Sequence, residues 1–258
     1  MLMLTPCEQR RCGHMASQRQ PSATPAMAGA SAQDAAALIS AFLATKHVPP
    51  TQAWMQSFVP TIRLNTPIAA LQKTALFRLL ATDLTTSIVK SPASCFPANI
   101  TDPQVKEEQV RGPVTVQILD VEDIGRSRWS QVEAIEAQER GETNKGREVI
   151  RVVPDENSPD TATQNESRSF GPHKLLLQDA NGAQVYATEI APVNGIGVQM
   201  AIGSKLVLTD FTVARGVILL EPRNAEMLCG KVDAWDKNWR EDRKKVLKEK
   251  AGWTENGG

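Results

Sequence analysis

The stretch HKLLLQDANGAQVYATEI, residues 173 to 190, decides the fold class. Its flanks, HKLLLQD (173 to 179) and QVYATEI (184 to 190), are rich in aliphatic and β-branched residues, a composition typical of β-strands. The pair Asn181-Gly182 between them is a preferred sequence for a tight reversal of the chain. These residues therefore predict a β-hairpin.

Three further stretches around this hairpin predict strands. They are VTVQILDVEDI (114 to 124), KLVLTDF (205 to 211) and VARGVILLEP (213 to 222). The glycine-rich link NGIGVQMAIGS (194 to 204) separates the third expected strand from the fourth. Five short strands with such a link are typical of a small closed barrel of the oligonucleotide/oligosaccharide-binding (OB) kind.

Residues 33 to 90 predict a three-helix bundle. Apolar residues recur there at helical spacing in three short runs, which prolines separate. Thr66 can cap the third helix, and Pro67 suits its first position. The apolar positions of the three runs are Leu38, Ile39, Phe42 and Leu43, then Trp54, Met55 and Phe58, and then Ile68, Leu71, Ala75 and Leu79.

The other segments complete an α+β architecture. Residues 1 to 32 are small, polar and proline-rich, which predicts a disordered tail. The barrel is expected over 91 to 230, with a flexible insertion at 125 to 171 between strands 1 and 2, because that span is far longer than a hairpin loop. Within it, WSQVEAIEAQERG (129 to 141) can form a helix. Residues 231 to 258 predict a C-terminal helix and tail.

Composition excludes several classes of protein. The 258 residues contain 29 Lys+Arg and 29 Asp+Glu, so the molecule as a whole has no field that would attract nucleic acid or an anionic surface. The sequence has no run of eighteen apolar residues, so we expect no membrane span. Between residues 121 and 170, acidic residues exceed basic ones by about four, which makes the insertion mildly acidic.

The sequence offers little for catalysis or metal binding. Of its three histidines, His14 lies in the expected tail, His47 at a helix end and His173 at the start of a strand. Cys7, Cys12 and His14 lack a fourth zinc ligand at a usable spacing. No phosphate-binding loop or serine elbow occurs. We therefore expect a non-enzymatic protein without catalytic residues, cofactor or metal.

An OB barrel can bind single-stranded DNA through aromatic side chains beside a basic groove. Tyr186 is the one aromatic residue in the predicted hairpin, and no dense basic stretch lies next to it in the sequence. We interpret Tyr186 as a half-buried barrel residue in preference to a stacking platform. The barrel can equally serve as a docking surface for a protein.

Longer strings resemble the RecQ-mediated genome instability protein 1 family. GSKLVLTDFTVARGVILLEPRNAEMLCGKVDAW (203 to 235) is similar to the family's hallmark stretch, in which a Gly-x-Lys strand precedes Gly-Val-x-Leu-Leu, Pro-x-Asn and Leu-x-Gly-x-Val-Asp-Ala. LATKHVPPTQAWMQSF (43 to 58) and LLATDLTTSI (79 to 88) resemble its N-terminal helices. LQDANG (177 to 182) and ATEIAPV (187 to 193) match its second and third strands. The resemblance runs from about Ala35 to Lys250.

This resemblance implies a non-enzymatic accessory subunit. Family members bind a type IA topoisomerase, topoisomerase III, and insert the long loop into its DNA gate. With a RecQ-family helicase, that complex promotes decatenation and dissolves double Holliday junctions. We expect a nuclear protein that contacts DNA mainly through the complex. The chain resembles the short fungal form, for which a second small OB subunit is not expected. The alternative is a stand-alone single-stranded DNA-binding module.

The resemblance and the apolar pattern select two groups of candidate residues. The expected topoisomerase-binding residues are Lys205, Gly203, Glu189, Pro192, Pro222 and Asn224. The expected gate-inserting residues are Trp129, Val132, Ile135, Arg147 and Ile150. Lys205 is the first candidate for the docking surface, and its other interpretation is an ordinary exposed lysine at a strand end.

Overall fold

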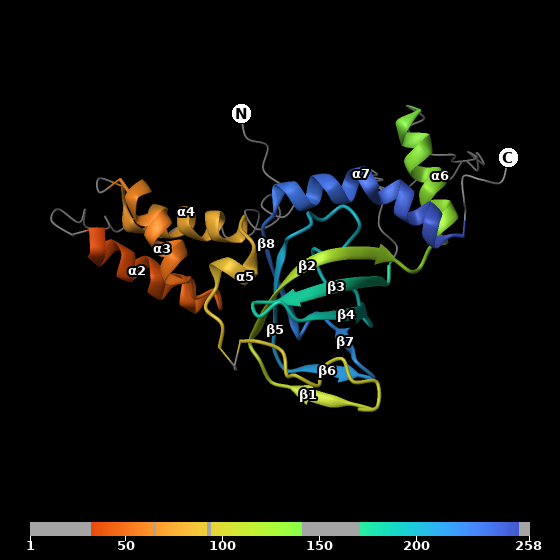
Figure 1. The fold of residues 1–258 in the computed structure, drawn as a ribbon, viewed down its shortest axis with the longest axis horizontal. Coiled ribbons are helices and arrows are strands. Elements are labelled where there is room, and N and C mark those ends of the chain that lie inside the picture. The colour runs from red at the N-terminus through yellow and green to blue at the C-terminus, as the bar shows by residue number, and fades with distance from the viewer. Residues whose placement is uncertain (1–31, 64–65, 92–93, 141–170, 253–258) are drawn as a thin grey trace, which may run out of the picture.

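The computed structural model describes residues 32–63, 66–91, 94–140 and 171–252. It confirms the α+β class: helices at the N-terminal end, a curled sheet in the middle and a long helix that crosses the top of the sheet (Figure 1). The N-terminal helices are α2 (Ala32–Thr45), α3 (Gln52–Phe58), the 3-10 helix η1 (Val59–Thr61), α4 (Ile68–Leu80) and α5 (Leu84–Ser87).

Local signals explain where these helices begin. The Thr51 hydroxyl accepts a hydrogen bond from the Trp54 N–H at 3.2 Å and caps α3. Pro67 is the N-cap residue of α4, so the prediction that Thr66 caps this helix is wrong. The three expected helices do not include α5, whose N-cap residue Asp83 accepts from the Thr85 N–H at 2.9 Å through its carboxylate.

The helices share one apolar cluster, and the barrel contributes to it. Ala180, in the turn of the predicted hairpin at 173 to 190, is buried among helix residues, so the bundle packs directly on the barrel. The buried members of this cluster are Ile39, Leu43, Val48, Phe58, Leu71, Ala75, Leu79, Leu84, Ile88 and Ala180.

Eight strands form one sheet in the described part of the chain. They are β1 (Glu108–Val110), β2 (Val114–Asp123), β3 (His173–Asp179), β4 (Gln184–Glu189), β5 (Lys205–Leu208), β6 (Phe211–Ala214), β7 (Val217–Leu220) and β8 (Ala225–Cys229). Their order is β1-β6-β7-β4-β3-β2-β5-β8, and β4 pairs with β7 in parallel while the other pairs are antiparallel.

The prediction of five strands holds for β2 and for the hairpin β3-β4, and the two strands expected after the hairpin differ from those observed. The expected strand at 213 to 222 is a second hairpin, because Arg215 (φ 54°) and Gly216 (φ 78°) form a tight turn between β6 and β7. A β-carbon at position 216 would lie 2.7 Å from the Thr101 carbonyl oxygen, so only glycine fits there. The expected strand at 205 to 211 ends at Leu208, and Asp210 has a positive φ of 47° where the chain bends into β6.

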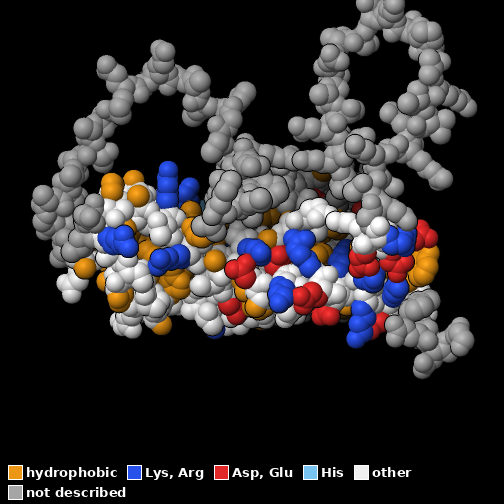
Figure 2. Space-filling view, turned by 90° about the horizontal axis from the view of Figure 1, so that it is seen from above, with side chains coloured by type: hydrophobic (Ala, Val, Ile, Leu, Met, Phe, Trp, Pro, Cys, Tyr) orange, Lys and Arg blue, Asp and Glu red, His pale blue; other side chains and the backbone are white. Residues whose placement is uncertain are grey.

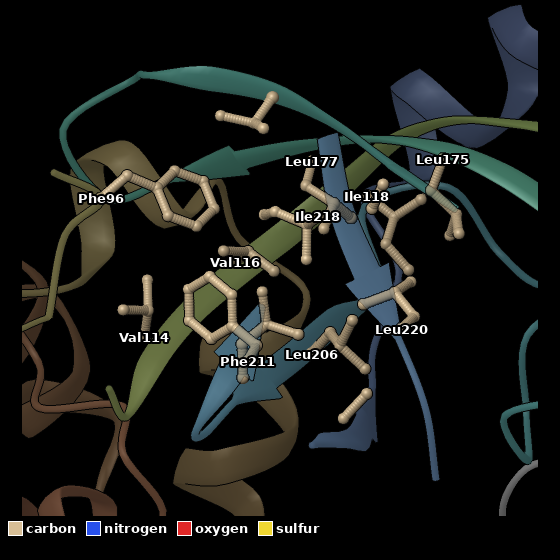
Figure 3. Packing of buried hydrophobic residues seen from close by; sticks show 14 of the residues in the cluster. Phe96, Val114, Val116, Ile118, Leu175, Leu177, Leu206, Phe211, Ile218 and Leu220 are labelled. Carbon is tan, nitrogen blue, oxygen red and sulfur yellow. The ribbon is translucent and has the colours of Figure 1, made fainter. Parts of the chain in front are cut away.

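This bend explains how the sheet curls. β5 and β6 lie near opposite ends of the strand order, yet residues 209 and 210 alone join them, so the two ends must approach one another. The inward-facing side chains fill the resulting half-barrel (Figure 3). The labelled members are Phe96, Val114, Val116, Ile118, Leu175, Leu177, Leu206, Phe211, Ile218 and Leu220.

Two helices complete the fold. α6 (Arg128–Glu139) begins shortly after β2, inside the span expected to be an insertion, and confirms the helix expected there. α7 (Asp233–Lys250) lies in the segment expected to form the C-terminal helix, and it crosses α6 (Figure 1).

Candidate partner-binding surface

Lys205 lies inside the molecule. Its side chain is 1% exposed, and its Nζ donates to the carbonyl oxygens of Thr82 at 2.6 Å and Gly203 at 2.7 Å. Burial lowers the pKa of Lys205 to about 7, although the nearby Asp83 carboxylate acts in the opposite direction. The interpretations of Lys205 as a docking residue or an exposed strand-end lysine are therefore wrong, because a partner cannot reach this ammonium group. Lys205 instead joins the barrel to the helical bundle.

Two side chains of β2 reinforce the same junction. The Gln117 amide oxygen accepts from the Leu84 N–H at 2.8 Å, and its nitrogen donates to Asp83 at 2.8 Å. The Thr115 hydroxyl donates to the His47 carbonyl oxygen at 2.5 Å. The sequence reading missed both residues. The sequence pattern could not reveal them, because a strand that alternates apolar with polar residues predicts one wet face, whereas β2 is buried on both faces at this end.

Glu189 is also buried. Its carboxylate accepts from the His173 N–H at 3.0 Å and from the Val193 N–H at 2.9 Å, and it contacts His173 Nδ1 at 2.5 Å. Burial by itself raises the pKa of Glu189, but the hydrogen bonds from His173 and Val193 outweigh it and hold that pKa below its usual value. Glu189 thus fixes the loop after β4, and within that loop Pro192 is exposed.

The remaining candidates of this group shape turns. Asn224 is 5% exposed, accepts from the Glu221 N–H at 2.9 Å and donates to the Leu219 carbonyl oxygen at 3.0 Å. Gly203 has a φ of 83°, and a β-carbon there would lie 2.6 Å from a Val232 methyl carbon. Glu189, Gly203, Lys205 and Asn224 therefore hold the fold and offer no contact surface, and only Pro192 and Pro222 of this group are exposed.

The insertion leaves and rejoins the barrel at one point. The Ile124 N–H donates to the Pro172 carbonyl oxygen at 3.0 Å, just before α6 and just ahead of β3. Of the expected gate residues, Trp129 is 45% exposed, Ile135 is half-buried and Val132 is fully buried. Val132 is thus a core residue and not a free anchor. Arg147 and Ile150 lie outside the described residues.

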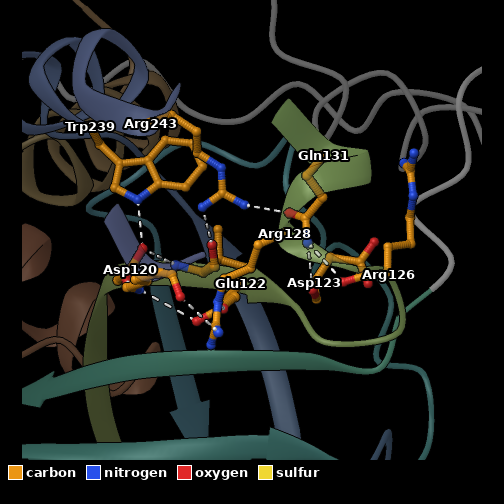
Figure 4. Close-up of polar contacts among 10 residues, drawn as sticks. Asp120, Glu122, Asp123, Arg126, Arg128, Gln131, Trp239 and Arg243 are labelled. Atoms are coloured by element: carbon orange, nitrogen blue, oxygen red, sulfur yellow. Dashed lines mark hydrogen bonds and ion pairs between the residues drawn. The ribbon is translucent and has the colours of Figure 1, made fainter. Parts of the chain in front are cut away.

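A polar network fixes the base of α6 (Figure 4). Arg243 of α7 donates to the Val121 carbonyl oxygen at 2.7 Å and to the Gln131 amide oxygen at 3.2 Å. The Gln131 nitrogen donates to the Asp123 carbonyl oxygen at 2.8 Å, and Arg128 forms an ion pair with Glu122 at 2.7 Å. Burial lowers the pKa of Arg243, against the pull of the nearby carboxylates.

The same network includes part of the basic run Arg243-Lys244-Lys245 in α7. Arg243 stacks over the Trp239 ring at 4.3 Å, and the Trp239 indole N–H donates to Asp120 at 2.7 Å. Lys244 forms an ion pair with Glu139 of α6 at 2.5 Å. Lys245, by contrast, has a side chain that is 77% exposed.

The outer face of the barrel carries a shallow hollow of about 230 Å³. Tyr186 is 48% exposed beside it, and the Lys174 ammonium lies 3.9 Å from the centre of its ring. Carboxylates and cations both line this hollow. Its lining residues are Asp120, Glu122, Arg128, Lys174, Leu175, Leu176, Tyr186 and Lys250.

Charge is unevenly distributed on the face seen from above (Figure 2). Asp and Glu side chains mix with Lys and Arg over the side that carries α7, whereas the helical bundle shows Lys, Arg and hydrophobic side chains. The described residues hold no cluster of three or more His, Cys, Asp or Glu side chains that could bind a metal. None of the described helices is both long and apolar enough to cross a membrane.

Comparisons with known proteins agree with this architecture. Residues 96–243 match the family RMI1, N-terminal OB-fold domain, and residues 42–87 match RMI1, N-terminal helical domain. RecQ-mediated genome instability protein 1 of Schizosaccharomyces pombe is 28% identical over 204 residues, which cover 72% of this chain and 83% of that protein. The Xenopus laevis protein of the same name is 27% identical over 194 residues, 74% of this chain and 32% of its own length. The chain therefore belongs to the RecQ-mediated genome instability protein 1 family, which supports a role in genome stability.

Proposed function

We propose that this protein is a non-enzymatic accessory subunit that binds a type IA topoisomerase, topoisomerase III, and acts with a RecQ-family helicase. In this role it promotes decatenation and the dissolution of double Holliday junctions. It works in the nucleus and contacts DNA mainly through the complex.

One observation carries the proposal: the insertion departs from the barrel and returns to it at a single point, beside a helix fixed to α7. The Ile124–Pro172 hydrogen bond of 3.0 Å closes the barrel beneath it. A segment mounted in this way can enter a partner while the barrel stays folded. It shifts the balance between open and closed gate states if it binds one of them better.

The structure shows how much of the insertion can be replaced in an experiment that tests this role. Replacing residues 126 to 170 would remove Val132 from the core and the ion pairs of α6, so the replacement should spare α6. We therefore replace residues 141 to 170 with a Gly/Ser linker of the same length. The expected result is an unchanged melting temperature, a stable one-to-one complex by size-exclusion chromatography with light scattering, and loss of stimulated decatenation. Full stimulation by this variant would contradict the proposal.

The alternative is a stand-alone single-stranded DNA-binding module, which the exposure of Tyr186 on β4 favours. One feature opposes it: the Lys174 ammonium lies over the ring that a base would stack on. Fluorescence anisotropy with a labelled oligonucleotide decides between the two. Tight binding by the chain alone that falls steeply with salt and is lost in Tyr186→Ala would favour the alternative.

A further inference from the structure

Two different kinds of contact hold α6 in place. Its first half is anchored through buried groups: Val132 is fully buried, and Gln131 is 7% exposed and bonded on both sides. Its second half faces α7 across solvent-accessible charges. The two halves should therefore differ in how firmly they are held.

Two ion pairs connect the second half of α6 to α7. Lys248 Nζ lies 2.7 Å from Glu136 Oε1, and Lys244 Nζ lies 2.5 Å from Glu139 Oε2. The side chains of Lys244 and Glu139 are 35% and 54% exposed. The hydrogen bond from Lys248 holds the pKa of Glu136 below its usual value, and the bond to Glu139 raises the pKa of Lys244.

Exposed ion pairs of this kind are individually weak and are screened by salt. Two such pairs can nevertheless fix the orientation of α6 relative to α7. They lie one helical turn apart on each helix and therefore define the angle between the two helices. A helix of 12 residues is about 18 Å long, so a tilt of about 20° moves its end by about 6 Å. That displacement exceeds what a fitted interface tolerates.

We propose that Lys244 and Lys248 are positioning residues that aim α6, and with it the insertion, toward the partner. The inference rests on the proposed function and names the residues that control it.

The test is a charge reversal with a charge-swap rescue. Lys244→Glu with Lys248→Glu replaces both attractions by repulsion. Adding Glu136→Lys and Glu139→Lys restores the two pairs with opposite polarity. The matched control is Lys237→Glu with Lys245→Glu, which makes the same change in net charge on α7. Among the described residues, these two lysines form their ion pairs within that helix, with Glu241 and Glu249.

The first readout is hydrogen exchange at the backbone amides of residues 133 to 140. We expect exchange about tenfold faster in the reversal, near wild-type exchange in the swap, and no change in the control. The second readout is topoisomerase stimulation. It should fall in the reversal with little change in complex affinity, and it should recover in the swap. If the charges of Lys244 and Lys248 acted directly on the partner, stimulation would not recover in the swap, because both positions still carry glutamate there.

The outcomes separate the two proposals. Unchanged hydrogen exchange in the reversal would show that the two ion pairs do not hold the second half of α6, and would overturn the positioning role. Faster exchange with full stimulation, while the replacement of 141 to 170 abolishes stimulation, would overturn the positioning role and leave the proposed function standing. No stimulation by the wild-type chain would overturn the proposed function itself, and the positioning role with it.

Discussion

The ammonium nitrogen of Lys205 lies 2.6 Å from the carbonyl oxygen of Thr82, a residue 123 positions earlier in the chain. Because the acceptor is a backbone atom, the contact does not depend on the side chain at position 82. Gln117 and Thr115 also bond to backbone atoms of the helical bundle. Side chains of the barrel therefore bind backbone atoms of the helical bundle, and these contacts hold the two parts in one fixed arrangement.

Removing this lysine should destabilise the protein. Lys205→Ala leaves the carbonyl oxygens of Thr82 and Gly203 buried without their donor and opens a cavity. We expect a loss of about 2–4 kcal/mol in the free energy of unfolding and a clear fall in melting temperature, measured by differential scanning calorimetry. The matched exposed substitution, Lys245→Ala, should stay within about 0.5 kcal/mol of wild type. Equal melting temperatures for the two variants would show that Lys205 is not buried in solution.

Stability should also rise with pH because of Lys205. Burial lowers its pKa to about 7 in the folded protein, whereas the unfolded chain keeps a value near 10.5. Between these values the unfolded state binds more protons, so the free energy of unfolding increases with pH by up to about 1.4 kcal/mol per unit. Urea unfolding of wild type and Lys205→Met at pH 6.5, 7.5 and 8.5 measures this difference. A gap between the two proteins that does not change with pH would mean that Lys205 titrates alike in both states.

The sequence predicted those parts of the fold that local patterns specify. The β3-β4 hairpin and α7 follow from composition, turn chemistry and period. The turn at Arg215-Gly216 was missed because Arg tolerates a positive φ only when the flanking strands impose it. Residues around this turn therefore looked like one continuous strand.

The candidate residues were harder to predict because burial depends on what covers a strand. Lys205 and Gln117 lie on the face of the sheet that the helical bundle covers, and a single sequence does not reveal this cover. Matching residues to a family motif identifies positions under strong constraint. It does not distinguish a residue that holds a turn, such as Asn224, from one that contacts a partner.

Glu189 should stabilise the loop after β4. Glu189→Ala removes the acceptor of the His173 and Val193 N–H groups, and we expect a loss of about 3 kcal/mol in urea unfolding at pH 7. Glu189→Gln retains one amide oxygen and should lose less. Since the folded pKa of Glu189 is lowered, its contribution is fully present above the unfolded value of 4.5 and fades as the pH falls through the folded value. Similar stability in wild type and Glu189→Ala would contradict this role.

Trp129 and Val132 lie three positions apart on α6 and should behave in opposite ways. Val132 is fully buried, so Val132→Ala should cost about 1–3 kcal/mol of stability. Trp129 is 45% exposed, so Trp129→Ala should leave the melting temperature nearly unchanged.

If the insertion meets the topoisomerase through α6, Trp129→Ala should weaken the complex at least several-fold in a titration calorimetry experiment, because exposed tryptophans at interfaces carry much of the binding energy. Val246→Ala, which truncates another exposed apolar residue, is the control on α7 and should bind as wild type does. A Trp129→Ala protein with wild-type affinity would place the contact beyond residue 140. A Val132→Ala protein as stable as wild type would mean that Val132 is not buried in solution.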